Sequence, residues 1–173
     1  MNKPIYNFLS TDHQRLDKLL NEAVADYNAI DSEKYHQFRV GLLTHIKMEE
    51  KILFPAAKKA NGNRNLPMIP QLRLEHGAIT ALMALPPSKD LTKVIRYILN
   101  IHDLKEEESG GVYEICERLA ETDTAAILQA FRTTTPVPVH PPNASPYVFE
   151  AAKRALKRAG FDYDEIVGLN LSE

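Results

Sequence analysis

The sequence predicts an all-α fold, an antiparallel up-down four-helix bundle with a short extra helix and a helical C-terminal extension. Apolar residues recur at steps of three and four along most of the chain, the spacing of one buried helix face. Residues that cap or stop helices divide this pattern into four long segments and leave only short connections between them. Long helices with short connections pack as antiparallel neighbours.

The first helix is expected over about residues 5–30, because its apolar stripe continues as far as Tyr27. Asp31 then provides an N-cap for the second helix. That helix is expected over about residues 33–60. Pro55 falls inside it and should kink it or end its regular part, since proline has no backbone N–H.

The third helix is expected over about residues 70–85, with a proline suited to its first turn. Ser88 is a candidate N-cap for the fourth helix, which should run to about Ala120. Gly110–Gly111 lies within it and should weaken or distort it. A short fifth helix over about residues 124–132 completes the compact part.

The last part of the chain has a different composition. Residues 133–146 are rich in proline and should be extended, while residues 147–159 form an amphipathic helix that Gly160 ends. We therefore divide the chain into a helical bundle, residues 1–132, and an extension, residues 133–173. The extension should pack on the bundle or on a partner subunit, which makes a homodimer one expectation.

Composition excludes several classes of protein. The chain has 173 residues, of which 44% are hydrophobic, enough for one domain with a buried core. Its net charge of -2 argues against nucleic acid as a partner. There is no run of 18 apolar residues to span a membrane and no apolar N-terminal stretch typical of secretion. A single cysteine, Cys116, allows no internal disulfide, so we expect a cytoplasmic protein.

Two of the predicted helices carry the pattern His-x-x-x-Glu-Glu. In the second helix it begins at His45, and in the fourth it begins at His102. Residues four apart share a helix face, so His45 and Glu49 point the same way, as do His102 and Glu106. A histidine and a carboxylate one turn apart can bind the same metal ion or two adjacent ions.

The other two helices carry an acidic residue followed directly by histidine. These pairs are Asp12 with His13 and Glu75 with His76. The chain thus repeats one unit, which predicts that four helices converge on one central site. Asp12 and Glu75 are candidates for orienting a ligand histidine through a hydrogen bond.

Together these patterns give four histidines and two carboxylates as candidate metal ligands: His13, His45, His76, His102, Glu49 and Glu106. Imidazole suits iron, zinc and copper, whereas carboxylates suit harder ions. A mixture with bridging carboxylates suits a pair of iron or manganese ions. Each metal would take two imidazoles, one oxygen from each glutamate and a solvent-derived bridge, which leaves one octahedral position open.

Simpler interpretations apply to the neighbouring residues. The remaining histidines, His36 and His140, fit ordinary surface positions. Taken singly, the acidic residues beside the ligands also fit a solvated helix face: Glu50, Glu107 and Glu108. Tyr113 could line the site, but packing in the core is the simpler interpretation, as it is for Cys116.

The sequence resembles the hemerythrin-like, or HHE cation-binding, domains. The segments TDHQRL, HIKMEEKILFP, LEHGAI and HDLKEEE occur in the order that this family shows, and the resemblance covers roughly residues 5–120. It implies two histidines for each iron and two bridging glutamates: His13 and His45, His76 and His102, Glu49 and Glu106.

One departure from the oxygen-carrying members of that family bears on function. Those proteins have a fifth histidine one turn from the helix-three histidine, whereas Leu72 and Thr80 lie one turn from His76 here. The departure leaves the metal pair in place but argues against simple reversible oxygen carriage. An acidic side chain could fill the extra position: Glu50, Glu75 or Glu107.

The resemblance therefore implies a non-haem di-iron protein that binds or senses a small diatomic, oxygen or nitric oxide. Its cofactor would be two iron ions with an oxo or hydroxo bridge, with manganese or zinc as the alternatives. A second hypothesis is a di-iron redox or stress-defence protein that consumes peroxide or nitric oxide or supplies iron for iron-sulfur repair. A third is a regulatory or interaction module whose metal is a switch, suggested by the C-terminal extension.

Overall fold

The computed structural model describes residues 3–169, which form helices and contain no strand. The predicted all-α class is therefore confirmed. The antiparallel four-helix arrangement stays a prediction. The outermost residues of the two predicted domains, 1–2 and 170–173, lie outside the described part of the chain. No helix within the described part is long and apolar enough to cross a membrane.

The chain divides into two compact units. Unit 1 comprises Met1–Ile69 and Asp103–Val139, and unit 2 comprises Pro70–His102 and His140–Glu173. The division falls within helix α5 (Lys89–Glu107), which contributes residues to both units.

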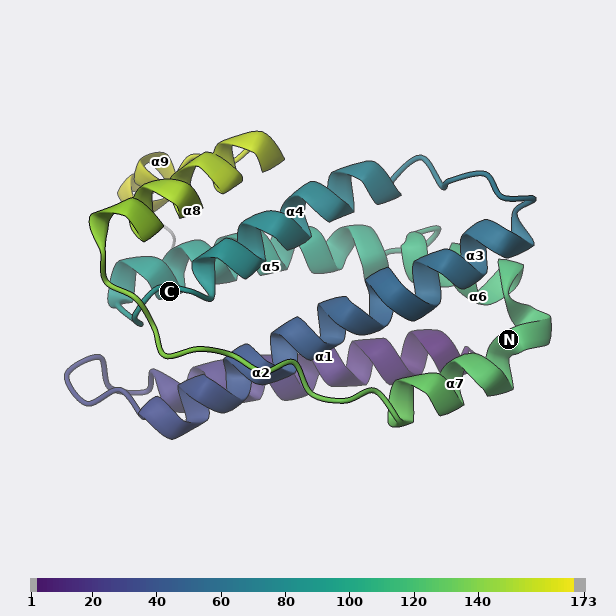
Figure 1. Cartoon of the computed structure of the whole chain (residues 1–173), viewed down its shortest axis with the longest axis horizontal. Helices are drawn as coiled ribbons and strands as arrows, with labels where there is room; N and C mark the ends of the chain where they lie inside the picture. The colour runs from purple at the N-terminus through teal and green to yellow at the C-terminus, as the bar shows by residue number, and fades with distance from the viewer. Residues whose placement is uncertain (1–2, 170–173) are drawn as a thin grey trace. The chain divides into compact units, whose positions relative to one another are not determined.

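In unit 1, helices α1 (Pro4–Ala23) and α2 (Ser32–Met48) lie side by side and run in opposite directions (Figure 1). Helix α1 ends before residue 30, so the predicted end was wrong. A turn stops it, because the Asp26 carboxylate accepts a hydrogen bond from the Asn28 amide at 2.8 Å. Tyr27 lies in this turn and is 38% exposed instead of continuing the apolar stripe.

Helix α2 begins as predicted, and a π-helical segment follows it just before Pro55. The Asp31 side chain caps α2. After Met48 the chain forms one π-helical segment, η1 (Glu49–Leu53), followed by helix α3 (Phe54–Ala60). The Phe54 amide donates to the carbonyl of Glu49, five residues back, and Pro55 then has no amide with which to continue the α-helical ladder. The distortion near Pro55 is confirmed, and it falls where Glu49 begins the wider turn.

Helix α5 ends at Glu107, so the prediction of one helix to Ala120 was wrong. Gly110 has a φ of 80°, which favours glycine. A Cβ atom on Gly111 would lie 2.8–2.9 Å from three backbone carbonyl oxygens. These two glycines make a tight turn that leads into helix α6 (Val112–Leu119).

The rest of unit 1 follows the predicted order. A short 3₁₀ turn, η2 (Glu121–Asp123), leads into helix α7 (Thr124–Arg132), which matches the expected fifth helix. The proline-rich segment then has no regular structure and crosses α2, where Val137 donates its amide to Thr44 Oγ1 at 3.0 Å.

Unit 2 pairs helix α4 (Ile69–Leu82) with the first part of α5, whose N-terminal turn is capped by Ser88. Its C-terminal part contains helices α8 (Pro146–Ala159) and α9 (Tyr163–Gly168). Helix α8 and its stop at Gly160, with a φ of 92°, confirm the prediction. Helix α9 was not predicted.

Hydrogen bonds join the C-terminal residues of unit 2 to α4, to the residues just after it and to α5. The Asn143 amide donates to the carbonyl of Ala84 at 2.8 Å. Gln71 donates to the carbonyl of Ala159 at 2.9 Å, and Lys93 donates to that of Val167 at 2.7 Å. Apolar residues fill the interior of this unit, among them Leu72, Ile79, Leu82, Ile98 and Leu156.

Candidate metal centre

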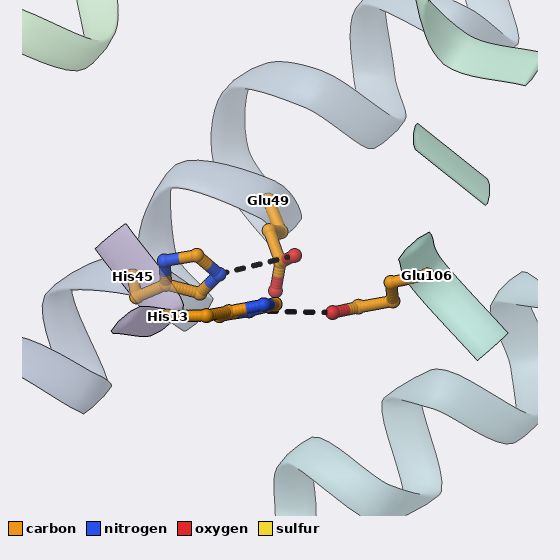
Figure 2. A group of neighbouring side chains, drawn as sticks. All are labelled: His13, His45, Glu49 and Glu106. Atoms are coloured by element: carbon orange, nitrogen blue, oxygen red, sulfur yellow. Dashed lines mark ion pairs between the residues drawn. The ribbon is translucent and has the colours of Figure 1, made fainter. Parts of the chain in front are cut away.

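Unit 1 brings four of the six predicted ligands together. His13 comes from α1, His45 from α2, Glu49 from η1 and Glu106 from α5 (Figure 2). One ligand atom from each lies within 4.8 Å of the others. All four residues are at least 92% buried, and both glutamates are fully buried. Buried carboxylates are expensive unless they are paired with positive charge or bind a metal ion.

The distances within this group suit a shared cation. His13 Nε2 lies 3.6 Å from Glu106 Oε2, and His45 Nε2 lies 3.4 Å from Glu49 Oε1 (Figure 2). Two donor atoms bound to one ion at about 2.0–2.2 Å are separated by roughly 3–4 Å. Two imidazoles and two carboxylates thus form a donor set that fits iron, manganese or zinc.

Unit 2 brings the other two predicted ligands together. His76 from α4 and His102 from α5 place their Nε2 atoms 3.2 Å apart. Both side chains are buried, at 3% exposure. Two nitrogens bound to one ion have about this separation, so the pair is compatible with a second metal position.

The predicted orienting carboxylates contact predicted ligand histidines, but on a neighbouring helix. Asp12 Oδ2 lies 3.0 Å from Nδ1 of His45, on the neighbouring helix. Glu75 Oε2 lies 2.9 Å from Nδ1 of His102. A carboxylate at Nδ1 fixes the ring so that Nε2 is the free donor atom for a metal.

A third such contact was missed in the sequence. Glu107 Oε1 lies 2.6 Å from Nδ1 of His13, although Glu107 was interpreted as a surface residue. Its side chain is 31% exposed, whereas the adjacent Glu108 is an exposed residue. The two glutamates are adjacent in the sequence and of the same type. In the structure, Glu107 is the last residue of α5 and Glu108 lies beyond it.

Tyr113 also lies at this site. Its hydroxyl is 2.5 Å from Glu49 Oε1, 2.9 Å from Glu106 Oε2 and 3.2 Å from Nε2 of both His13 and His45. Packing in the core was the simpler interpretation of Tyr113, and the side chain is fully buried, but its hydroxyl also contacts the four clustered residues. The sequence signal was an aromatic residue that follows each His-x-x-x-Glu-Glu pattern.

The other singled-out residues lie elsewhere. His36 and His140 are exposed, in line with the surface interpretation, and Cys116 is fully buried. Glu50 lies next to Glu49 in the π turn and is only partly exposed.

The carboxylates make the pocket of unit 1 strongly anionic. Burial lowers the pKa of His45, but the charge of Glu49 and the hydrogen bond that the His45 ring donates to Asp12 outweigh burial and raise that pKa to about 10. Burial raises the pKa of Tyr113 well above its ordinary value, and the neighbouring carboxylates Glu106 and Glu49 raise it further. The same carboxylates attract a metal cation, which must displace these protons when it binds.

The fold and these clusters define a helical protein whose buried histidines and glutamates are compatible with cation binding. The family model of the hemerythrin HHE cation binding domain matches residues 5–108, more than half of the chain. The chain therefore belongs to that family. No curated protein and no solved structure matches the chain significantly.

Proposed function

We propose that this chain holds two iron ions and uses them to bind or sense a small diatomic molecule, oxygen or nitric oxide. The observation that carries the proposal is the fully buried pair of glutamates with a histidine beside each, at distances that suit one cation. Burying these carboxylates without a cation would cost several kcal/mol.

The proposed centre has the six ligands predicted from the sequence. Glu49 and Glu106 would bridge two ions, one of them held by His13 and His45 and the other by His76 and His102. One continuous helix supports this assignment, because His102 and Glu106 are one turn apart in α5. The protein's further contribution is orientation, through the carboxylates at Nδ1 of three ligand histidines.

The surroundings favour a small ligand. The predicted ligands are buried, which restricts access of large molecules to them. Reduced iron supplies an electron-rich site for oxygen or nitric oxide, and no larger substrate is implied by the buried donor set.

The test is the visible spectrum of the anaerobically reduced, iron-loaded protein before and after addition of oxygen and then of nitric oxide. A charge-transfer band that appears with the gas and reverses on its removal is the expected result. Glu49→Ala should abolish metal binding, whereas Glu108→Ala, at an exposed neighbour of the site, should leave it intact. Full metal loading of Glu49→Ala would overturn the bridging assignment.

A second candidate function is redox or stress defence. The observation that favours it is the position one turn from His76, where Leu72 is fully buried and Thr80 is exposed, so neither supplies the imidazole of an oxygen carrier. Sustained consumption of peroxide or nitric oxide by the iron-loaded protein would favour this function over reversible binding. Iron that oxidises once and stays oxidised in the gas-binding test would point the same way.

A further inference from the structure

We propose that Tyr113 is itself a ligand of the metal ion in unit 1, bound through its phenolate oxygen. The inference rests on the proposed function, because it requires the metal centre. It adds a seventh protein ligand, from a helix that carries none of the other six.

Convergence of the donor atoms is the first argument. The Tyr113 hydroxyl contacts one atom of each of the four clustered residues of unit 1, at 2.5–3.2 Å. A hydroxyl has one proton to donate and two lone pairs, so it cannot satisfy two carboxylates and two imidazoles together. An arrangement in which four metal-binding atoms surround one oxygen is better explained by a cation that all five share.

The distances are the second argument. The hydroxyl lies 2.5–3.2 Å from the four atoms, somewhat closer than His45 lies to Glu49, at 3.4 Å, or His13 to Glu106, at 3.6 Å. Adjacent donor atoms on one ion are about 3 Å apart. Metal–ligand bonds are shorter, about 2.0–2.2 Å. The Tyr113 oxygen thus has the spacing of another corner of the coordination polyhedron, so an ion bound to these four atoms would touch it.

The fold also holds the ring in place. Tyr113 is fully buried at the start of α6, just after the tight turn at Gly111. The ring of Tyr6 packs against it edge to face, with centroids 6.1 Å apart, and Tyr6 is anchored by its amide to Glu117 and by its hydroxyl to the Glu107 carbonyl. A ring fixed on this side cannot easily swing away when an ion enters.

The chemistry is consistent with iron. Phenolate is a hard, anionic oxygen donor of the kind that iron(III) prefers, and tyrosine is the iron ligand in haem catalases. On binding, the O–H bond of Tyr113 is replaced by an O–metal bond, and one proton leaves to solvent. No oxidant or reductant is needed for this step.

Resonance Raman spectroscopy of the full-length protein loaded with iron(III) tests the proposal, with iron per chain measured on the same sample. The expected result is a visible band whose excitation enhances tyrosinate ring vibrations, and these vibrations should shift when the protein contains ring-deuterated tyrosine. Tyr113→Phe should lose both while it retains iron. Tyr6→Phe should keep them, because the Tyr6 hydroxyl contacts a backbone carbonyl and no ligand.

The outcomes separate the two proposals. Bound iron without tyrosinate vibrations in the wild-type protein overturns the tyrosine ligand and leaves the metal centre standing. Tyrosinate vibrations that persist in Tyr113→Phe also overturn it. Absence of bound iron overturns both proposals. If Tyr113→Phe does not fold, the isotope shift in the wild-type and Tyr6→Phe proteins decides, since within residues 3–169 Tyr113 is the tyrosine whose hydroxyl contacts the clustered ligands.

Discussion

At the scale of single residues, hydrogen bonds from histidine rings to carboxylates orient those rings at the site. His45 lies between two carboxylates, Asp12 at Nδ1 and Glu49 at Nε2, and both contacts fix the same ring plane. His13 is held in the same way by Glu107 and Glu106. Each outer carboxylate places a charge in a buried or half-buried position, and in exchange it orients the ring of a histidine that we propose as a metal ligand.

The substitution Glu107→Gln tests whether this carboxylate orients the ring of His13. The amide keeps the shape but loses the charge that orients His13, so we expect iron affinity to fall about 10- to 100-fold. The measurement is competition with a chelator of known affinity. Glu108→Gln is the matched control, because it removes the same charge from the exposed neighbour. Equal losses in both variants would show that overall charge, and not the contact with His13, sets the affinity.

Outside the site, Tyr35 has a buried hydroxyl that makes no hydrogen bond within the described residues. The residue is 2% exposed. Burial raises its pKa to about 12, an effect that the charge of Arg39 partly opposes. The unfolded chain loses this proton near pH 10 and the folded chain only near 12, so the contribution to stability is present below about pH 10 and decreases above it.

Tyr35→Phe should therefore raise the free energy of unfolding by about 1 kcal/mol, because an unsatisfied buried hydroxyl is removed. It should also reduce the loss of stability above pH 10. Denaturant unfolding of the metal-free protein on both sides of pH 10 measures both effects. Tyr27→Phe, at an exposed position, should change neither. A destabilised Tyr35→Phe protein would show that the hydroxyl has a partner that stabilises the fold.

At the scale of elements, the turn between α5 and α6 positions the site. It places Glu106 before the break and Tyr113 after it, and it depends on Gly111, where a side chain would meet three carbonyl oxygens. Gly111→Ala should destabilise the fold by roughly 1–3 kcal/mol through overpacking against backbone and should weaken metal binding.

Gly77→Ala is the control for that prediction. A Cβ atom there has nothing within 4 Å, and the residue lies on the exposed side of α4. It should be neutral or stabilising by up to about 1 kcal/mol, because alanine is the better helix former. Thermal unfolding of both variants, with iron content measured alongside, gives the comparison. An unaffected Gly111→Ala protein would mean that the turn adjusts freely.

The elements also show what could be predicted from the sequence. Caps and stops were predictable, because Asp31, Ser88 and Gly160 act through local chemistry. The end of α1 was not, since an Asp turn interrupts a helix only where packing permits it. The pair Gly110–Gly111 was expected to distort the fourth helix, but not to end it. Packing in the core was the simpler interpretation of Tyr113, and Glu107 taken singly fitted a solvated helix face, so the contacts of both with the clustered residues were not predicted.

At the scale of the whole molecule, the proposed ligands are distributed over both units, which the chain visits alternately. A metal ion that binds the folded chain and not the unfolded one stabilises it in proportion to the logarithm of its concentration. If the four histidines and two glutamates hold one metal pair, its removal should lower the unfolding temperature of the entire chain. Separate melting of the two units, with only one of them sensitive to the metal, would argue against a shared pair.

The number of iron ions per chain, measured by native mass spectrometry after anaerobic loading, tests the central claim most directly. About two ions per chain are expected from a pair bridged by carboxylates, and Glu106→Ala should lose both together because it removes a shared ligand. A chain that binds no metal, or that binds one ion and keeps it in Glu106→Ala, would contradict the account.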